Sequence, residues 1–439
     1  MLQRNIHFDF SKSAGKIKPV LSLNSGPLAT PSLACDLTEK HRELGVAFVR
    51  THGHPADRVI DVHTVFPDFN LDERFPSSFN FAPTDTYLCA IKDSGASILL
   101  RLGESPEPYE VKRYSALPTD PEKWASVVER IIAHYSEGWG CGMKLGIKYV
   151  EITAGLDAHL APEERPAFYE LYRTVANRLR ARFPRIKIGA YSAGGFHSLN
   201  HYDATPAERG YIDFLDGFLD YITASETAAP IDFFSWSCCA ETPEELSLHS
   251  NYARNYLNQA GLRKVQSIVT DFSVSPRTAT YRDRAYPSVL ISSLILAQKG
   301  DVSMLFIDGN PESDGCPIWS VEDRHGVHTY AAFNALSAFG RLARLGTAVD
   351  GSEDYRHAVY SLAAFDGTEG AIIVSTDDYN GVIELSIEGA SFTTYSIKGI
   401  IGGGDRGDGY STEAKNIKFS DGKVRLRAGK NEVYLITLV

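Results

Sequence analysis

A carboxyl group, an imidazole and a thiol–hydroxyl pair are the side chains of this sequence that could carry out acid–base or nucleophilic chemistry. Asp271 supplies the carboxyl group, and a carboxylate in apolar surroundings has a raised pKa and is a stronger base. His54 could act as a general base towards a Ser or Cys nucleophile. Ser237 and Cys239 lie two residues apart, so in a strand both would point to the same face.

Two catalytic schemes follow, and each has a simpler alternative. In the first, Asp271 abstracts a proton; the alternative is a carboxylate that pairs with Arg50. In the second, His54 forms a dyad with Cys239 or Ser237 and cleaves an activated ester. The alternative is that His54 is a solvated loop residue and that the Cys and Ser are small residues that open space. Geometry rather than composition decides between these interpretations.

The surrounding sequence predicts the elements that would position these side chains. Short runs rich in β-branched and aromatic residues alternate with amphipathic helical stretches from about residue 17 to residue 345. The eight runs are 17–24, 47–53, 98–104, 149–155, 186–192, 233–240, 267–273 and 302–308. This order predicts a (β/α)8 TIM barrel, in which reactive groups lie where the strands run into the following loops. Several of these runs end in polar residues or Gly, as expected for a pocket at that face.

The pattern of predicted elements changes after about residue 346. Short β-rich segments, separated by turn dipeptides such as Asp366-Gly367 and Asn380-Gly381, predict an accessory antiparallel β-sandwich over 346–439. Residues 1–16 are assigned to the same unit, because residues 5–10 could add a strand to it. The glycine-rich run 402–407 is not followed by a helix with Lys-Ser/Thr, so a hairpin loop is expected rather than a phosphate loop.

Six segments spread over nearly the whole chain carry a family resemblance. They are GKIKP at 15–19, FVRTH at 48–52, FNFAPTD at 79–85, YVEI at 149–152, DFFSW at 232–236 and KNEVYLI at 430–436. With these segments the chain resembles glycoside hydrolase family 39, the β-xylosidase and iduronidase family of clan A. The resemblance implies the barrel-plus-sandwich fold and a retaining mechanism, with a Glu acid/base after the fourth strand and a Glu nucleophile on the seventh.

The same resemblance implies that the catalytic positions are altered. The acid/base position falls on Gly155 and the nucleophile position on Asp271. Retaining hydrolysis needs two carboxyl groups about 5–5.5 Å apart, and Gly155 supplies none. Asp271 is one methylene shorter than Glu, and a displacement of about 1 Å can cost on the order of a hundredfold in rate. Ordinary retaining glycosidase activity is therefore not expected.

These changes favour a glycoside-hydrolase-like barrel whose active site is dismantled and remodelled, by evolution or by engineering. The pocket is expected to be roomier and less polar, and to accept a small non-sugar substrate. The alternative is a pseudoglycosidase or a weak, atypical glycosidase that binds a xyloside-like sugar. The residues expected to bind the ligand are Arg50, Gly53, Glu104, Thr153, Gly155, Trp236, Ser273, Phe306 and Asp308.

Composition limits the partners. The formal charge of -11 disfavours nucleic acid, whose phosphates need clustered Lys and Arg. No apolar run is long enough for a membrane span, no signal peptide is expected, and the six scattered cysteines suggest reduced thiols and a cytoplasmic protein. No cofactor is expected. No metal is expected either, because His52, His54 and His63 lack the close spacing of zinc ligands. The oligomeric state remains open.

Overall fold

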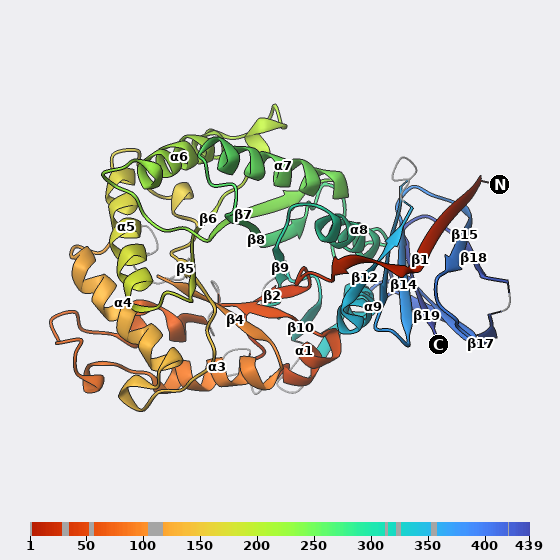
Figure 1. Ribbon diagram of the computed structural model, residues 1–439, viewed down its shortest axis with the longest axis horizontal. Coiled ribbons are helices and arrows are strands. Elements are labelled where there is room, and N and C mark those ends of the chain that lie inside the picture. Colours follow the sequence, from red (N-terminus) through yellow and green to blue (C-terminus); the bar gives the residue numbers. More distant parts are fainter. Residues whose placement is uncertain are drawn as a thin grey trace.

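Eight short parallel strands close into a barrel in the computed structural model of this chain (Figure 1). Each strand pairs with the next along the sequence, and the last pairs with the first. The strands are β2 (Ser22–Asn24), β3 (Phe48–Arg50), β4 (Ser97–Leu102), β5 (Tyr149–Ile152), β6 (Lys187–Ala193), β7 (Phe233–Ala240), β8 (Gln266–Val274) and β9 (Met304–Asp308). All eight predicted strands are present, which confirms the (β/α)8 barrel, although the first is shorter than expected.

Helices surround the barrel on its outer side (Figure 1). They are α1 (Thr38–Leu44), α2 (Val62–Val65), α3 (Ala82–Asp93), α4 (Pro121–Ser136), α5 (Arg165–Arg182), α6 (Pro206–Thr223), α7 (Pro243–Gln259), α8 (Tyr286–Lys299) and α9 (Ala331–Leu345). Short 3-10 turns occur at Asp57–Ile60, Pro76–Ser78, Trp139–Cys141, Leu156–Ala158 and His197–Leu199. The structure describes residues 2–28, 35–51, 57–103, 117–311, 315–321, 326–352, 358–419 and 421–439.

Local sequence signals explain where the helices around the site begin. α6 starts with a capping box, in which the Thr205 hydroxyl accepts from the backbone N–H of Glu208 and the Glu208 carboxylate accepts from that of Thr205. α7 starts as the sequence predicts, because the Thr242 hydroxyl accepts from the backbone N–H of Glu245. Pro206 and Pro243 occupy the first turns of these helices, where no N–H is needed.

The interior of the barrel is closed by an apolar layer. One buried cluster gathers the inward-facing side chains Leu99, Tyr149, Phe233, Ile268, Met304 and Phe306, with Phe48 packed against it. These side chains alternate along the strands with residues that face the helices. The layer is a floor, so any ligand site must lie above it, towards the carboxyl ends of the strands.

Nine further strands form the accessory unit. They are β1 (Leu2–Lys16), β12 (Thr347–Gly351), β13 (Val359–Phe365), β14 (Gly370–Thr376), β15 (Gly381–Glu388), β16 (Thr394–Ile401), β17 (Tyr410–Lys418), β18 (Lys423–Ala428) and β19 (Glu432–Leu438). They lie in the order β17-β16-β19-β14-β13-β12-β1-β15-β18. The predicted N-terminal strand therefore joins this unit, and residues 402–409 link β16 to β17 in a hairpin.

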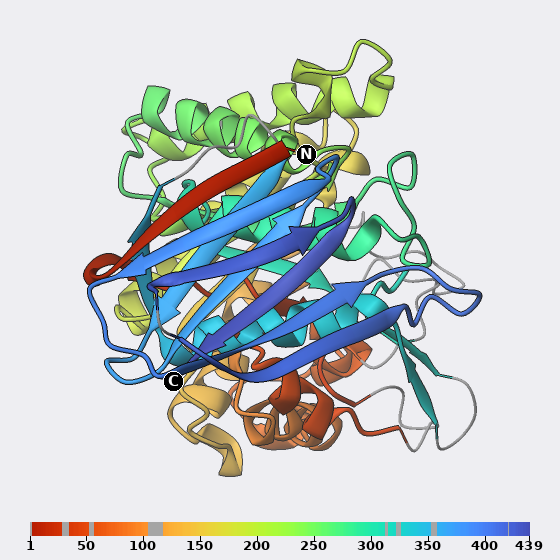
Figure 2. The same cartoon turned by 90° about the vertical axis from the view of Figure 1, so that its right-hand side faces the viewer.

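One continuous hydrogen-bonded sheet makes both layers of the predicted sandwich (Figure 2). Side chains of β1, β15 and β18, such as Phe8, Leu385 and Leu426, share a buried core with Ile372 of β14 and Ile436 of β19. Strands from the two halves of the sheet, β19 and β14 on one side and β1, β15 and β18 on the other, thus enclose a common core. β1 pairs with β15 in parallel and with β12 antiparallel, and irregular pairing with β12 after Asp9 marks where this long strand bends.

The sheet also packs against the barrel. Ile373 on β14 belongs to the large core shared with the barrel helices, whereas its neighbours Ile372 and Val374 point into the sandwich. The Ser292 hydroxyl of α8 donates to Ser375, which in turn donates to the backbone carbonyl of Ser288. A hairpin of β10 (Trp319–Val321) and β11 (Val327–Thr329) precedes α9. Among the described residues, no helix combines the length and the apolar character needed to cross a bilayer.

Candidate functional site

A buried polar layer lies directly above the apolar floor of the barrel. The Arg50 Nε donates to Glu151 Oε2 at 2.7 Å, and both side chains are fully buried. Arg50 also approaches Asn24 Oδ1 at 3.3 Å, and Asn24 Nδ2 donates to the carbonyl oxygen of Thr270 at 2.9 Å. Burial of this ion pair requires such partners. Arg50 therefore supports the site from below, and direct contact with a ligand is not expected of it.

Asp271 lies at the mouth of the barrel, near the end of β8. Irregular pairing of β8 with β7 and β9 precedes it and sets it beside Ser237. Its side chain is exposed within a cavity, yet the surrounding protein and the Asp308 carboxylate raise its pKa to about 6, which Arg50 partly offsets. At neutral pH Asp271 is thus mostly ionised and is a stronger base than an ordinary aspartate.

The cavity beside Asp271 has a volume of about 410 Å³. Ser237 and Cys239 of β7 and Ser273 of β8 line it, as the two-residue period predicts. Cys238 between them also borders the cavity, but its side chain is buried, with Sγ 3.6 Å from His249 Nδ1. Its charged and titratable lining residues are His197, His201, Asp203, Glu208, Glu241 and Arg277. These charged groups share the lining with a larger amount of apolar surface, so the expectation of a less polar pocket stays a prediction.

The structure tests the proposed dyad only in part. His54 lies outside the described residues, as do Gly53 and Glu104. Ser237 and Cys239 are half-buried at the cavity wall. The described histidine nearest to Cys239 is His197, whose Nε2 accepts from the backbone N–H of Cys239 at 3.4 Å. This contact involves the backbone, so it does not activate the thiol.

Trp236 and Phe306 do not reach the cavity, contrary to their expected role in ligand binding. Trp236 is fully buried on the helix-facing side of β7, where its Nε1 donates to the Ser267 hydroxyl and its ring packs edge-on to Phe196. Phe306 belongs to the apolar floor of the barrel. The position of Trp236 follows from the strand alternation, which the sequence reveals only when the register is known. Phe306 faces inward but lies one layer below the mouth of the barrel. Asp308 shares the inward face with Phe306 and is half-exposed.

Residues 153–156, Thr-Ala-Gly-Leu, follow the end of β5 and contain no carboxyl group. Thr153 and Gly155 both have a positive φ of 63°, and a Cβ atom at Gly155 would meet no other atom within 4 Å. Thr153 lines a second cavity of about 800 Å³ together with Gly103 and Ala154. The Thr153 hydroxyl donates to the carbonyl oxygen of Ile152. The position that the resemblance assigns to an acid is thus open space.

Asp157 is a buried carboxyl group that the sequence analysis did not single out. It follows Gly155 by two residues, and its Oδ2 accepts from the backbone N–H of Gly194, a lining residue of the cavity. Burial raises the pKa of Asp157 to about 7, against the lowering effect of this hydrogen bond. Its Oδ1 is buried and has no hydrogen-bond partner among the described residues.

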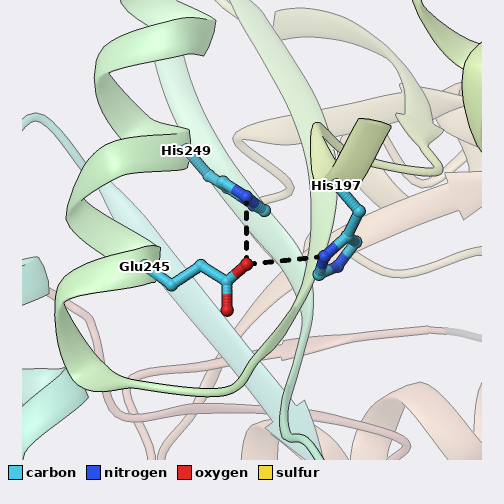
Figure 3. Close-up of side chains that lie close together, drawn as sticks. All are labelled: His197, Glu245 and His249. Atoms are coloured by element: carbon cyan, nitrogen blue, oxygen red, sulfur yellow. Dashed lines mark ion pairs between the residues drawn. The ribbon is translucent and has the colours of Figure 1, made fainter. Parts of the chain in front are cut away.

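A second group that sequence reasoning missed lies where the segment after β6 meets α7 (Figure 3). Glu245 accepts hydrogen bonds from the Asn200 amide, His201 Nε2 and the backbone N–H of Glu241. Burial raises the pKa of Glu245, but these hydrogen bonds outweigh it and lower the pKa to about 2. Burial lowers the pKa of His249 to about 4 and also lowers that of His197, whereas the Glu245 carboxylate raises the pKa of His201.

Comparison with solved structures places this fold among glycoside hydrolases. No protein-family model and no curated protein sequence matches the chain. A glucosidase from Croceicoccus marinus has 19% sequence identity and a TM-score of 0.77, over 100% of this chain and 99% of that one. A monomeric beta-xylosidase from Caulobacter crescentus CB15 has 14% identity and a TM-score of 0.68, over 99% of each chain.

A GH39 enzyme from Xanthomonas axonopodis pv. citri has 15% identity and a TM-score of 0.67, over 99% of this chain and 97% of that one. The similarity spans both the barrel and the accessory unit, so the chain shares the two-part fold of these enzymes. At these identities it concerns the fold alone, and function must be argued from the site itself.

Proposed function

We propose that this protein is an atypical, glycoside-hydrolase-like protein that binds a glycoside at the mouth of the barrel and uses Asp271 as its reactive carboxylate. The observation that carries this proposal is the position of Asp271, exposed in a cavity with several charged lining residues near the end of the seventh barrel strand, with a pKa raised to about 6. The fold shared with a glucosidase and a beta-xylosidase supports a sugar as the ligand.

The lining of the cavity suits a polyhydroxylated ligand. The carboxylates of Asp203, Glu208 and Glu241 accept hydrogen bonds, and Arg277 donates them. A sugar presents both donors and acceptors along its ring. The donors and acceptors in this lining therefore support a sugar as the ligand.

The absence of a carboxyl group at 153–156 limits the reaction. In the proposed step an Asp271 oxygen forms a bond to the anomeric carbon while the bond from that carbon to the leaving oxygen breaks, and the electron pair leaves with that oxygen. A general acid normally protonates the leaving oxygen. If no acid replaces the one missing at 153–156, only a leaving group that is stable as an anion, such as a nitrophenolate, departs readily. Water then cleaves the glycosyl ester.

The decisive measurement compares glycosides that differ only in the leaving group. We expect dinitrophenyl xylosides, glucosides or arabinosides to be turned over and methyl glycosides of the same sugar to be inert. A 2-deoxy-2-fluoro sugar with the same leaving group should add one glycosyl mass to a peptide containing Asp271. Ser273→Ala, a change in the same cavity, is the matched control and should retain the adduct, which Asp271→Asn should lack.

Equal rates for dinitrophenyl and methyl glycosides would show that an acid does reach the leaving group and would refute the proposal. Sugar binding by calorimetry without turnover of any glycoside would identify a pseudoglycosidase instead.

A second candidate rests on the same raised pKa. A carboxylate with a pKa of about 6 can abstract a proton from an activated carbon acid. Turnover of such a carbon acid, with loss in Asp271→Asn and no binding of any sugar, would favour base catalysis over the glycoside proposal. Hydrolysis of an aryl ester that survives in Asp271→Asn but disappears in Cys239→Ala or Ser237→Ala would favour the dyad.

A further inference from the structure

Three side chains outside the Asp271 site converge on one point next to the cavity (Figure 3). His197 comes from the 3-10 turn His197–Leu199 after β6. Glu245 and His249 lie one turn apart on α7 and so share a face of that helix. His249 and Glu245 are buried and His197 is half-buried.

The two distances to Glu245 are too long for hydrogen bonds and are close to the separation of two ligands of one ion. Glu245 Oε1 lies 3.5 Å from His249 Nε2 and 3.7 Å from His197 Nδ1, beyond the 2.7–3.2 Å range of N–H···O bonds. Two ligands that are each about 2.0–2.2 Å from a tetrahedral zinc ion lie roughly 3.3–3.6 Å apart. All three ligand atoms lie within 4.8 Å of one another.

We propose that His197, Glu245 and His249 bind a divalent transition-metal ion of the zinc or cobalt class. Two imidazole nitrogens and one carboxylate oxygen are ligands that such ions accept. Magnesium and calcium prefer oxygen ligands alone and do not fit this set. The bound ion would link the segment after β6 to α7. His197 also lines the cavity, so this link would lie at the cavity wall.

Neighbouring groups are placed to support the ligands from behind. His201 Nε2 donates to Glu245 Oε1, and the backbone N–H of Glu241 donates to Oε2 at 2.7 Å. The Cys238 Sγ lies 3.6 Å from His249 Nδ1, the nitrogen that faces away from Glu245. Such outer partners orient ligating side chains and fix the imidazole tautomer.

Binding of the ion requires two hydrogen bonds to be exchanged. His249 Nε2 lies 2.8 Å from Asn200 Oδ1, and His197 Nε2 accepts from the Cys239 N–H at 3.4 Å. Coordination through His249 Nε2 and His197 Nδ1 displaces a proton from each of these two nitrogens and moves it to the other nitrogen of its ring. The ion therefore replaces two contacts with two coordinate bonds: the one between His249 Nε2 and Asn200 Oδ1, and the long one between His197 Nε2 and the Cys239 N–H.

The test uses the full chain, freed of metal with a chelator and then titrated with Zn²⁺ and with Co²⁺. We expect one ion per chain by calorimetry and a visible absorption band of tetrahedral or five-coordinate cobalt. The Tm should rise with metal concentration, because the ion binds only the folded chain. None of these measurements depends on enzymatic activity, so failure of the Asp271 proposal would leave the result intact.

Variants distinguish this site from adventitious binding. His201→Ala removes an outer partner and should weaken metal binding by roughly 10–100-fold. His197→Ala and His249→Gln each remove a ligand and should weaken metal binding by more than that. His7→Ala, on β1 of the sandwich, is the matched control and should bind like the parent chain. If buried His249→Gln does not fold, half-buried His197→Ala decides the outcome alone. Absence of stoichiometric binding, or unchanged affinity in His197→Ala, would overturn the proposal.

Discussion

At the scale of single residues, the environment of Asp271 determines its chemistry. Its pKa is raised to about 6 because the protein around the cavity partly desolvates the carboxylate and because the Asp308 carboxylate lies nearby. An aspartate that must be ionised to act as nucleophile or base gains activity as the pH rises through its pKa. The pH dependence of turnover therefore reports on the surroundings of this one side chain.

We predict that turnover of an activated substrate rises as the pH increases through about 6 and then levels off. Asp308→Asn removes a like charge, so the pKa of Asp271 should fall and the rise should move to lower pH. The measurement is the pH profile of kcat/KM for both chains. Asp271→Asn should lose at least roughly a hundredfold in rate at all pH values. An identical profile for the parent chain and Asp308→Asn would show that Asp271 is not the titrating group.

Asp157 supports a prediction about stability. Its pKa in the folded chain is raised from 3.8 to about 7, so the folded state holds its proton more tightly than the unfolded state does. The free energy of unfolding therefore falls between about pH 4 and pH 7. Asp157→Asn has no such titration. The difference in free energy of unfolding, variant minus parent chain, should therefore increase by roughly 3–4 kcal/mol from pH 4 to pH 8. Urea unfolding of both chains at the two pH values measures this difference.

At the scale of elements, the caps of α6 and α7 hold the segments that line the cavity. α6 follows the lining residues Asp203 and Ala204, and α7 carries Glu245 and His249. The irregular pairing of β7 and β8 reorients their ends, so that Ser237 and Asp271 become neighbours at the mouth. The loops and strand ends, rather than the barrel floor, therefore set the shape of the site.

We predict that Thr205→Ala lowers the free energy of unfolding by about 1 kcal/mol, because it removes the hydroxyl that caps the Glu208 N–H. Glu208→Gln keeps an acceptor for the Thr205 N–H, so it is the matched control and should cost much less. Chemical denaturation followed by circular dichroism measures both changes. Equal losses in the two variants would mean that the charge at Glu208, and not the cap, stabilises α6.

At the scale of the whole molecule, the accessory sheet and the barrel share a core through β14, α8 and α9. Ile373 faces the barrel helices, whereas its neighbour Ile372 faces the interior of the sandwich. The two side chains have the same volume and are both fully buried. They provide a pair of sites for testing whether the two units unfold together.

We predict that Ile373→Ala and Ile372→Ala each cost roughly 2–5 kcal/mol and lower the same Tm. All four tryptophans, Trp124, Trp139, Trp236 and Trp319, lie between accessory strands β1 and β12 in the sequence, in the barrel segment, so their fluorescence follows the barrel. Circular dichroism follows both units. Coincident transitions are expected in the parent chain and both variants. A fluorescence transition that Ile372→Ala leaves unchanged would show that the units unfold separately.

The sequence by itself determined the fold and the position of Asp271. Eight β-rich runs alternating with helices leave few topologies other than a barrel, and strand periodicity alone put Ser237 and Cys239 on one face. Gly155 already excluded a carboxyl group at its position. These features are local, and a local pattern is readable without knowing what packs against it.

Only the tertiary structure decided which side chains meet. Trp236 points away from the cavity because strand register, which depends on long-range pairing, fixes its face, whereas Phe306 faces inward but lies below the cavity in the apolar floor. His197 and Glu245 are 48 positions apart (245 minus 197), and the spacing of Glu245 and His249 on one predicted helix was the sole local sign of their cluster. The raised pKa values of Asp271 and Asp157 likewise arise from burial and neighbouring charge, which exist only once distant segments have packed together.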